Sequence, residues 1–327
     1  MTLLEIDDLR VAFPGPTGPI NAVNGVSLKV DAGQTLAILG ESGSGKSVTA
    51  QAVMGILDTP PARISGAVRL HGRELLTLPR KQRDRISGEE IGMVFQDAMA
   101  ALNPVFTVGH QIMEVLRVRR GMSRADARRR AVELVDRVRI PAAKDRVRDY
   151  PHQFSGGMRQ RIMIALAISL EPDLLIADEP TTALDVTVQA QVMELLAEIQ
   201  RDSGMGLLLI THDLGVVAEV ADDVAVMYAG RLVEQGTVEQ IFDGPAHPYT
   251  EGLLASMPRV DRRDDVLYAI PGAPPNPARL PAGCPFHLRC PRATDECRTA
   301  LPLLEVLPAN RASACHHHEE VLGATRR

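Results

Sequence analysis

A glycine-rich segment, GESGSGKS at residues 40–47, limits the folds open to this chain more strictly than any other stretch. It has the form G-x-x-x-x-G-K-[ST], in which small residues let successive backbone N–H groups curve around a polyphosphate. The apolar run TLAIL at residues 35–39 predicts a buried parallel strand directly before it. A helix after the loop would point its positive end at the same anion. The sequence therefore predicts a strand, loop and helix that bind a nucleotide.

Two pairs of side chains indicate what happens to that nucleotide. Lys46 can place its ammonium group between the β- and γ-phosphates, and the Ser47 hydroxyl can ligate Mg²⁺. Farther along, the apolar run LLIA leads into Asp178 and Glu179. A carboxylate at the end of such a strand can hold Mg²⁺ through water, and the adjacent one can polarise an attacking water. Combined with the phosphate loop, this pair favours hydrolysis over transfer to a small acceptor.

The bulk properties narrow the class of protein. A chain of 327 residues can form one α/β core and a smaller second unit. A net charge of -5, 3% aromatic residues and no Trp argue against a nucleic-acid binder. An apolar run long enough to span a membrane is absent, and the first eight residues are acidic where a secretory signal would be basic. We therefore expect a cytoplasmic protein.

Hydrophobic patterns predict the order of elements. Residues 3–13 and 26–30 alternate as strands do, and apolar strands at 174–177 and 207–211 enclose a helical pattern at 188–199. A helical stretch precedes the strand at 174–177, and within it Ser123 and Asp126 form a capping-box pattern. After about residue 245 a proline-rich segment, PGAPPNPARLPAGCPF, excludes a regular helix or a central strand.

The segment FSGGMRQR at residues 154–161 resembles the signature sequence of the ATP-binding cassette (ABC) ATPases, L-S-G-G-Q. Ser155, Gly156 and Gly157 match it, whereas Phe154 and Met158 depart from its commonest form. A hydroxyl and backbone N–H groups at a helix N-terminus can hold a γ-phosphate. In this family the signature facing each phosphate loop comes from another subunit. The resemblance therefore implies a dimer of cassettes that closes on two ATP molecules and opens after hydrolysis.

The same resemblance assigns further residues. Gln96 looks like the glutamine that reaches Mg²⁺ or the lytic water, His212 like the switch histidine that holds the γ-phosphate, and the segment TALD at 182–185 like the D-loop. Phe13 is the candidate for stacking on adenine, with a core position as its alternative. The predicted nucleotide-binding residues are Phe13, Gly40, Glu41, Ser42, Gly43, Ser44, Gly45, Lys46, Ser47, Thr49, Gln96, Ser155, Gly156, Gly157 and Asp178. The predicted catalytic residues are Gln96, Glu179 and His212, and the predicted Mg²⁺ ligands are Ser47, Gln96 and Asp178.

Several longer stretches, including DEPTTALDVTVQAQVMELL and HPYTEGLL, resemble the ATPases of the dipeptide/oligopeptide and nickel importers. This resemblance implies an ATP-hydrolysing subunit on the cytoplasmic face of the membrane that drives uptake of di- or oligopeptides. Its partners would be a second ATPase, two permease subunits and an extracytoplasmic binding protein, with no nucleic acid. Nickel or another small solute remains open as cargo. The rivals are a soluble ABC ATPase acting on DNA or ribosomes and a small-molecule kinase, which the SGGMRQR segment and His212 oppose.

All four cysteines, Cys284, Cys290, Cys297 and Cys315, fall in the last part of the chain with the spacing C-x5-C-x6-C-x17-C. Disulfides are unfavourable in a reducing cytoplasm, and zinc sites usually contain C-x2-C pairs. Wider spacing suits an iron–sulfur cluster. Some importer ATPases of this kind carry a [4Fe–4S] cluster on cysteines placed in this way. We therefore expect a structural cluster, with zinc and idle thiols as the alternatives.

Taken together, the motifs predict an α/β protein of the P-loop NTPase (RecA-like) class with a parallel sheet core. An antiparallel β-subdomain would precede it, a helical insert would occupy about residues 97–157, and a small metal-binding extension would follow. The predicted domains are an ABC ATPase cassette at 1–240 and the importer-type extension at 241–327.

Overall fold

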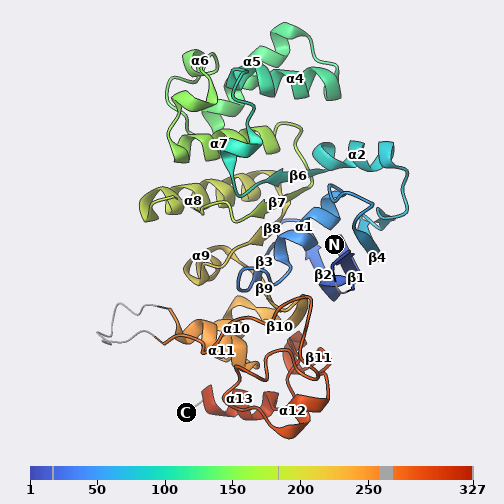
Figure 1. Ribbon diagram of the computed structural model, residues 1–327. Coiled ribbons are helices and arrows are strands. Elements are labelled where there is room, and N and C mark those ends of the chain that lie inside the picture. Colours follow the sequence, from blue (N-terminus) through green and yellow to red (C-terminus); the bar gives the residue numbers. More distant parts are fainter. Residues whose placement is uncertain (17, 183, 258–267, 326–327) are drawn as a thin grey trace. The chain divides into compact units, whose positions relative to one another are not determined.

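The computed structural model describes residues 1–16, 18–182, 184–257 and 268–325 (Figure 1). Ala183 of the predicted D-loop segment, and residues 258–267 and 326–327 of the predicted extension, lie outside the described residues. The chain divides into two compact units. The first consists of Met1–Leu4, Val30–Gln34 and Thr77–Ile210. The second consists of Glu5–Lys29, Thr35–Leu76 and Thr211–Arg327.

Three parallel strands form the centre of the first unit: β6 (Ile91–Val94), β7 (Leu174–Asp178) and β8 (Gly206–Ile210). In the register of this sheet, Leu174 lies opposite both Ile91 and Gly206. Every residue of the three strands is buried, as expected where both faces of a parallel sheet are covered. The two strands predicted at 174–177 and 207–211 are thereby confirmed, with small shifts at their ends.

Helices make up most of the rest of the first unit (Figure 1). They are α2 (Arg80–Glu89), α3 (Ala98–Ala101), α4 (Val108–Arg120), α5 (Arg124–Arg137), α6 (Ala143–Arg146), the 3-10 turn η1 (Pro151–Gln153), α7 (Gly156–Ala167) and α8 (Val186–Ser203). The predicted capping pattern at the start of α5 is confirmed, because the Ser123 hydroxyl accepts a hydrogen bond from the Asp126 N–H. The helices from α3 to α6 lie between β6 and α7 in the chain, where a helical insert is predicted.

A four-stranded sheet with the order β2-β1-β4-β5 contains the N-terminal strands. Its members are β1 (Thr2–Phe13), β2 (Ile20–Asp31), β4 (Arg63–Leu70) and β5 (Arg73–Glu74). Strand β2 begins earlier than the predicted segment 26–30. Gly25, with φ +82°, breaks the alternation of the sequence without ending the strand.

The second unit also contains a mixed set of strands that positions the phosphate loop. Strand β3 (Thr35–Leu39) runs parallel to β9 (Asp223–Tyr228), and β9 pairs antiparallel with β10 (Arg231–Thr237). Two short C-terminal strands, β12 (Ala312–Ser313) and β11 (Glu305–Val306), continue the sheet beyond β10. The C-terminal segment therefore completes the sheet that contains β3.

The second unit also contains helices. They are α1 (Lys46–Met54), α9 (Leu214–Val220), α10 (Val238–Asp243), α11 (Pro248–Ala255), α12 (Asp295–Thr299), the 3-10 turn η2 (Pro308–Asn310) and α13 (His318–Thr325). Two of them, α9 and α10, contact the strands β3, β9 and β10. The proline-rich segment at 271–286 contains neither helix nor strand, as predicted. Among the described residues, none of the helices combines the length and apolar character needed to cross a lipid bilayer.

The extension is attached by an apolar core as well as by strand pairing. Tyr249 and Phe286 are buried with Tyr228 of β9 and Leu39 of β3 in one cluster. The centroids of the Tyr228 and Tyr249 rings are 4.6 Å apart, and those of Tyr249 and Phe286 are 5.4 Å apart. Burying one such side chain stabilises a fold by about 1.5–3 kcal/mol. This packing gives the proline-rich extension more core than its composition suggests.

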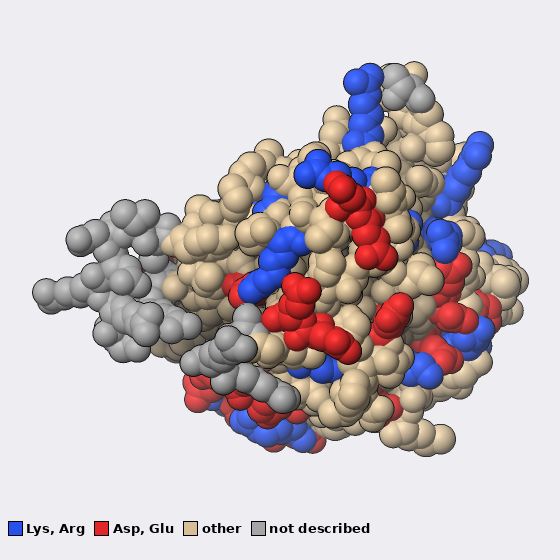
Figure 2. All heavy atoms as spheres, turned by 90° about the horizontal axis from the view of Figure 1, so that it is seen from below, with Lys and Arg blue, Asp and Glu red and all other residues tan. Residues whose placement is uncertain are grey.

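Charges of both signs share the molecular face shown in Figure 2, and uncharged atoms cover most of it. Within the extension, some charged side chains form ion pairs. Arg292 forms an ion pair with Glu251, and Arg298 lies 3.6 Å from Asp295. The second pair is exposed, and exposed ion pairs contribute little to stability.

Candidate nucleotide-binding and catalytic site

The phosphate loop has the predicted strand–loop–helix geometry. Strand β3 ends at Leu39 and α1 begins at Lys46. Gly40 has φ +153°, and a Cβ atom there would lie 2.3 Å from the Met227 carbonyl oxygen. Gly45 has φ +102°, and its Cβ would lie 2.4 Å from the carbonyl oxygen of Ala22. Only glycine fits these two positions, because the loop runs directly against neighbouring backbone.

The ammonium group of Lys46 is held inside the loop. Its Nζ donates to the carbonyl oxygens of Gly40, at 2.7 Å, and Glu41, at 3.0 Å, and the residue is 4% exposed. The Ser44 N–H also donates to the Glu41 oxygen, at 3.2 Å. Thr49 Oγ1 donates to the Gly45 oxygen at 3.0 Å, which links the first turn of α1 to the loop. A fixed cation thus lies where the motif predicts the phosphates of a nucleotide.

Two residues that the sequence reasoning missed hold Glu41 from the C-terminal part of the chain. The Glu41 N–H donates to the Tyr249 hydroxyl at 2.9 Å. The guanidinium group of Arg289 donates to both carboxylate oxygens of Glu41, at 2.7 and 2.9 Å. Tyr249 lies within the recognised HPYT segment, whereas nothing in the sequence pairs Arg289 with a residue 248 positions earlier.

The predicted catalytic carboxylate lies beside the predicted water-positioning glutamine. Strand β7 ends at the buried Asp178, and Glu179 follows with φ +46°. Its N–H donates to the Ile210 oxygen at 2.8 Å. Gln96 Nε2 and Thr182 Oγ1 both donate to Glu179 Oε2, at 3.1 and 2.9 Å. A non-glycine residue in this backbone region stores strain, as functional residues often do. The first unit thus brings Gln96 and Glu179 together.

The signature residues form the N-terminus of α7, as predicted. Ser155 caps the helix by accepting a hydrogen bond from the Met158 N–H, and Gly156 and Gly157 are its first residues. A Cβ atom on Gly157 would lie 2.3 Å from Val188 Cγ1 of α8. The glycine therefore permits close packing of α7 on α8. The 12-residue helix points its positive end toward this segment.

The two other predicted residues, His212 and Phe13, belong to the second unit. His212 is exposed and precedes Asp213, whose side chain caps α9. Phe13 is half-buried as the last residue of β1. Their roles at the γ-phosphate and at adenine stay predictions.

The four cysteine thiols are free. Burial, with smaller contributions from Cys297 and Cys290, raises the pKa of Cys284 to about 11. Burial is also the main cause that raises the pKa of Cys315 to about 12, a value that includes smaller contributions from the other three cysteines. Nevertheless, across the described ranges no group of three or more His, Cys, Asp or Glu side chains is arranged to hold a metal ion. A metal site in the extension is thus not shown.

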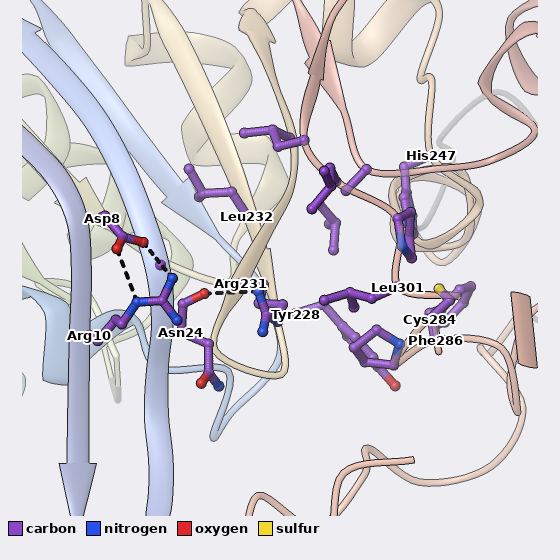
Figure 3. A pocket seen from close by; sticks show the side chains of 17 residues that line it. Asp8, Arg10, Asn24, Tyr228, Arg231, Leu232, His247, Cys284, Phe286 and Leu301 are labelled. Carbon is purple, nitrogen blue, oxygen red and sulfur yellow. Dashed lines mark hydrogen bonds and ion pairs between the residues drawn. The ribbon is translucent and has the colours of Figure 1, made fainter. Parts of the chain in front are cut away.

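A cavity of about 210 Å³ lies in the second unit, beside the aromatic cluster (Figure 3). Its polar wall includes Arg10, which donates to Asp8, and Arg231, which donates to the Asn24 carbonyl oxygen at 3.1 Å. Phe286 and other apolar residues of the C-terminal segment form the opposite wall. No residue of the phosphate loop lines this cavity, so it is separate from the predicted nucleotide site.

Comparisons with known proteins agree with this geometry. The family model for ABC transporters matches residues 23–182, and the model for the oligopeptide/dipeptide transporter C-terminal region matches residues 233–297. The oligopeptide transport ATP-binding protein OppD of Salmonella typhimurium is 52% identical over 98% of this chain and 95% of its own length. The corresponding protein AppD of Bacillus subtilis is 48% identical over 98% of each chain.

Solved structures give the same fold. The dimeric ATP-binding cassette MJ0796, bound to ADP and phosphate, superposes with a TM-score of 0.65 at 26% identity, covering 72% of this chain and 99% of that one. The structure of cbiO1 from Clostridium perfringens superposes with a TM-score of 0.64 at 30% identity, covering 74% and 90%.

The fold, the phosphate loop and the signature helix define an ABC-type ATPase, an enzyme that hydrolyses ATP. Within that class, the chain belongs to the oligopeptide/dipeptide group of ABC transporter ATP-binding proteins. The family, the cassette fold and the ATPase activity predicted from sequence are confirmed.

Proposed function

We propose that this chain is the nucleotide-binding subunit of an ABC importer that couples ATP hydrolysis to uptake of di- and oligopeptides. The observation that carries this proposal is the near full-length identity to oligopeptide transport ATP-binding proteins, which includes the C-terminal extension. The cassette alone would fit many transporters, since its motifs serve ATP chemistry and not cargo.

The proposed chemistry assigns one task to each side chain. Lys46 neutralises the β- and γ-phosphates, and Ser47 and Asp178 supply the oxygen ligands that Mg²⁺ prefers. Glu179 acts as the base for the attacking water, and Gln96, which donates to its carboxylate, orients that water. His212 holds the γ-phosphate, and Phe13 stacks on adenine. The remaining residues of the phosphate loop, together with Thr49 of α1, surround the phosphates.

The proposed working unit is a dimer of two cassettes. The start of α7, formed by Ser155, Gly156 and Gly157, would complete the phosphate site of the partner cassette. The similar cassette MJ0796 is dimeric in its solved structure, which supports this arrangement. We propose a heterodimer with a second ATPase subunit.

The proposed assembly places the dimer on the cytoplasmic face of the membrane, attached to two permease subunits that receive peptide from an extracytoplasmic binding protein. Relatives described as oligopeptide transport ATP-binding proteins support such partners. We propose the cassette at residues 1–240, with its helical insert at about 97–157, and the extension at 241–327.

We further propose that Cys284, Cys290, Cys297 and Cys315 are the ligands of a [4Fe–4S] cluster, with a zinc ion as the alternative. The Cys284 N–H donates to the Cys297 carbonyl oxygen at 2.8 Å, so two of these cysteines are neighbours in space, which supports the proposal. A four-iron cluster is larger than a single ion, so its ligands stand farther apart than those of zinc. The spacing of the four cysteines in the sequence is wider than in the C-x2-C pairs usual for zinc, which favours the cluster.

The test is peptide uptake by cells that carry the complete importer with Glu179→Gln as the only source of this chain. We expect phosphate release to fall by at least about 100-fold and uptake of a labelled tripeptide to stop, while ATP binding persists. Glu219→Gln, at an exposed position on α9, is the matched control and should transport normally. Normal uptake with the Glu179 variant would rule out the proposal.

A further inference from the structure

Glu41 places a negative charge inside the loop that is expected to receive a triphosphate. A carboxylate so close to an incoming polyanion opposes its binding unless a cation neutralises it. The cation that pairs with this carboxylate is Arg289, which belongs to the C-terminal extension and not to the cassette motifs.

Arg289 is held rigidly in its place. It is 7% exposed, and its Nε donates to the Pro271 carbonyl oxygen at 3.0 Å. The guanidinium carbon lies 5.9 Å from the Tyr228 ring centroid and 6.0 Å from that of Phe286, two side chains labelled in Figure 3. Its two terminal nitrogens are thereby directed at the carboxylate of Glu41 as a bidentate fork.

Tyr249 holds the same residue from a second direction. Its hydroxyl accepts the hydrogen bond of the Glu41 N–H, and its ring is fully buried in the aromatic cluster. The carbonyl oxygen of Glu41 in turn accepts from Lys46 and Ser44. The backbone of Glu41 therefore links the extension directly to the phosphate-binding lysine.

We propose that Arg289 and Tyr249 are positioning residues of the nucleotide site, through which the docked extension fixes the shape and the charge of the phosphate loop. This inference rests on the proposed role of that loop. Because the loop would hold the phosphates alike before and during hydrolysis, loss of Arg289 weakens ATP binding and leaves the chemical step unaffected. The extension thereby sets the ATP concentration at which the subunit works.

The experiment measures binding of a fluorescent ATP analogue and steady-state hydrolysis on the full-length chain. We expect Arg289→Gln to weaken ATP binding and raise KM about tenfold, with kcat within about twofold of wild type. Adding Glu41→Gln to that variant should recover most of the lost affinity, since the unneutralised carboxylate is removed. Arg279→Gln, an exposed arginine of the same extension, is the matched control and should bind like wild type.

The possible results separate the two proposals. A wild-type chain that binds no ATP would refute the nucleotide site itself. If wild type binds and Arg289→Gln binds equally well, or if the double variant is as weak as the single one, the positioning role is wrong. Tyr249→Phe removes only the hydroxyl and should weaken ATP binding by a smaller factor than Arg289→Gln. If a thermal melt without nucleotide shows that Arg289→Gln is unfolded, Tyr249→Phe is the variant that tests the proposal. An unchanged affinity in Tyr249→Phe would then count against the proposal.

Discussion

His247 is fully buried at the start of α11, where its Nδ1 accepts a hydrogen bond from the Tyr249 N–H. Burial lowers the pKa of this imidazole to about 3 from an ordinary value of 6.5. The folded protein therefore holds His247 neutral, whereas the unfolded chain takes up a proton below pH 6.5. The histidine at the start of α11, the helix that contains Tyr249, therefore makes the folded protein less stable at acidic pH.

From this shift we predict that the free energy of unfolding falls by about 2 kcal/mol between pH 7 and pH 5 through His247 alone. The loss continues toward pH 3, because only there does the folded state begin to bind the proton. His247→Asn keeps an acceptor at the start of α11 but cannot titrate, so its pH profile should be flatter by that amount. Urea unfolding of both proteins at the two pH values checks this, and parallel profiles would contradict it.

At the scale of elements, the contact between α7 and α8 explains why the signature needs its second glycine. Val188 of α8 lies against Gly157, whereas among the described residues the Cβ of a residue at position 156 would meet only Leu184 Cδ2, at an ordinary 3.6 Å. Valine is stiff at χ1 in a helix, so it cannot easily turn away. The two neighbouring glycines of one motif therefore differ in their packing.

This difference predicts that Gly157→Ala destabilises the protein by about 1–3 kcal/mol through overpacking. Gly156→Ala is the matched comparison and should cost much less, since it meets no close contact. Adding Val188→Ala to the Gly157 variant should relieve the clash. Chemical unfolding of the four proteins measures these differences, and equal losses in the two glycine variants would show that the close approach to Val188 does not matter.

The motif-bearing elements were the predictable part of this structure. The phosphate loop, the Ser155 cap of α7 and the strand ending at Asp178 follow from local patterns, because each depends on residues close together in sequence. The ion pair between Glu41 and Arg289 does not, since it joins residues 248 positions apart with no local signal. The aromatic core beneath the extension escaped prediction for the same reason, as its members come from separate elements.

At the scale of the whole molecule, buried charge also joins the extension to the cassette strands. Glu234 of β10 is fully buried, and its carboxylate accepts hydrogen bonds from Arg311 at 2.7 Å and from the N–H groups of Ala246 and His247. Breaking such a pair by removing one partner costs about 3–5 kcal/mol, because an uncompensated charge remains buried. The extension is therefore anchored at β10 independently of its cysteines.

For the cysteines we predict that protein purified without oxygen is brown and contains about four irons per chain. Cys290→Ser should lose the colour and the iron, yet the sheet anchored by Glu234 and Arg311 should keep the chain folded. Visible absorption and metal analysis on both proteins decide the matter. If the wild-type protein is colourless and contains one zinc per chain, the cluster is wrong and the zinc alternative holds. If it contains no metal, both the cluster and the zinc site are wrong.

Tyr249 and Arg289 follow Glu41 by 208 and 248 residues, so a ribosome must make most of the chain before either can reach it. While the polypeptide is still being synthesised, its phosphate loop is without both of these supports. The geometry seen here is therefore complete only after Arg289 has been synthesised.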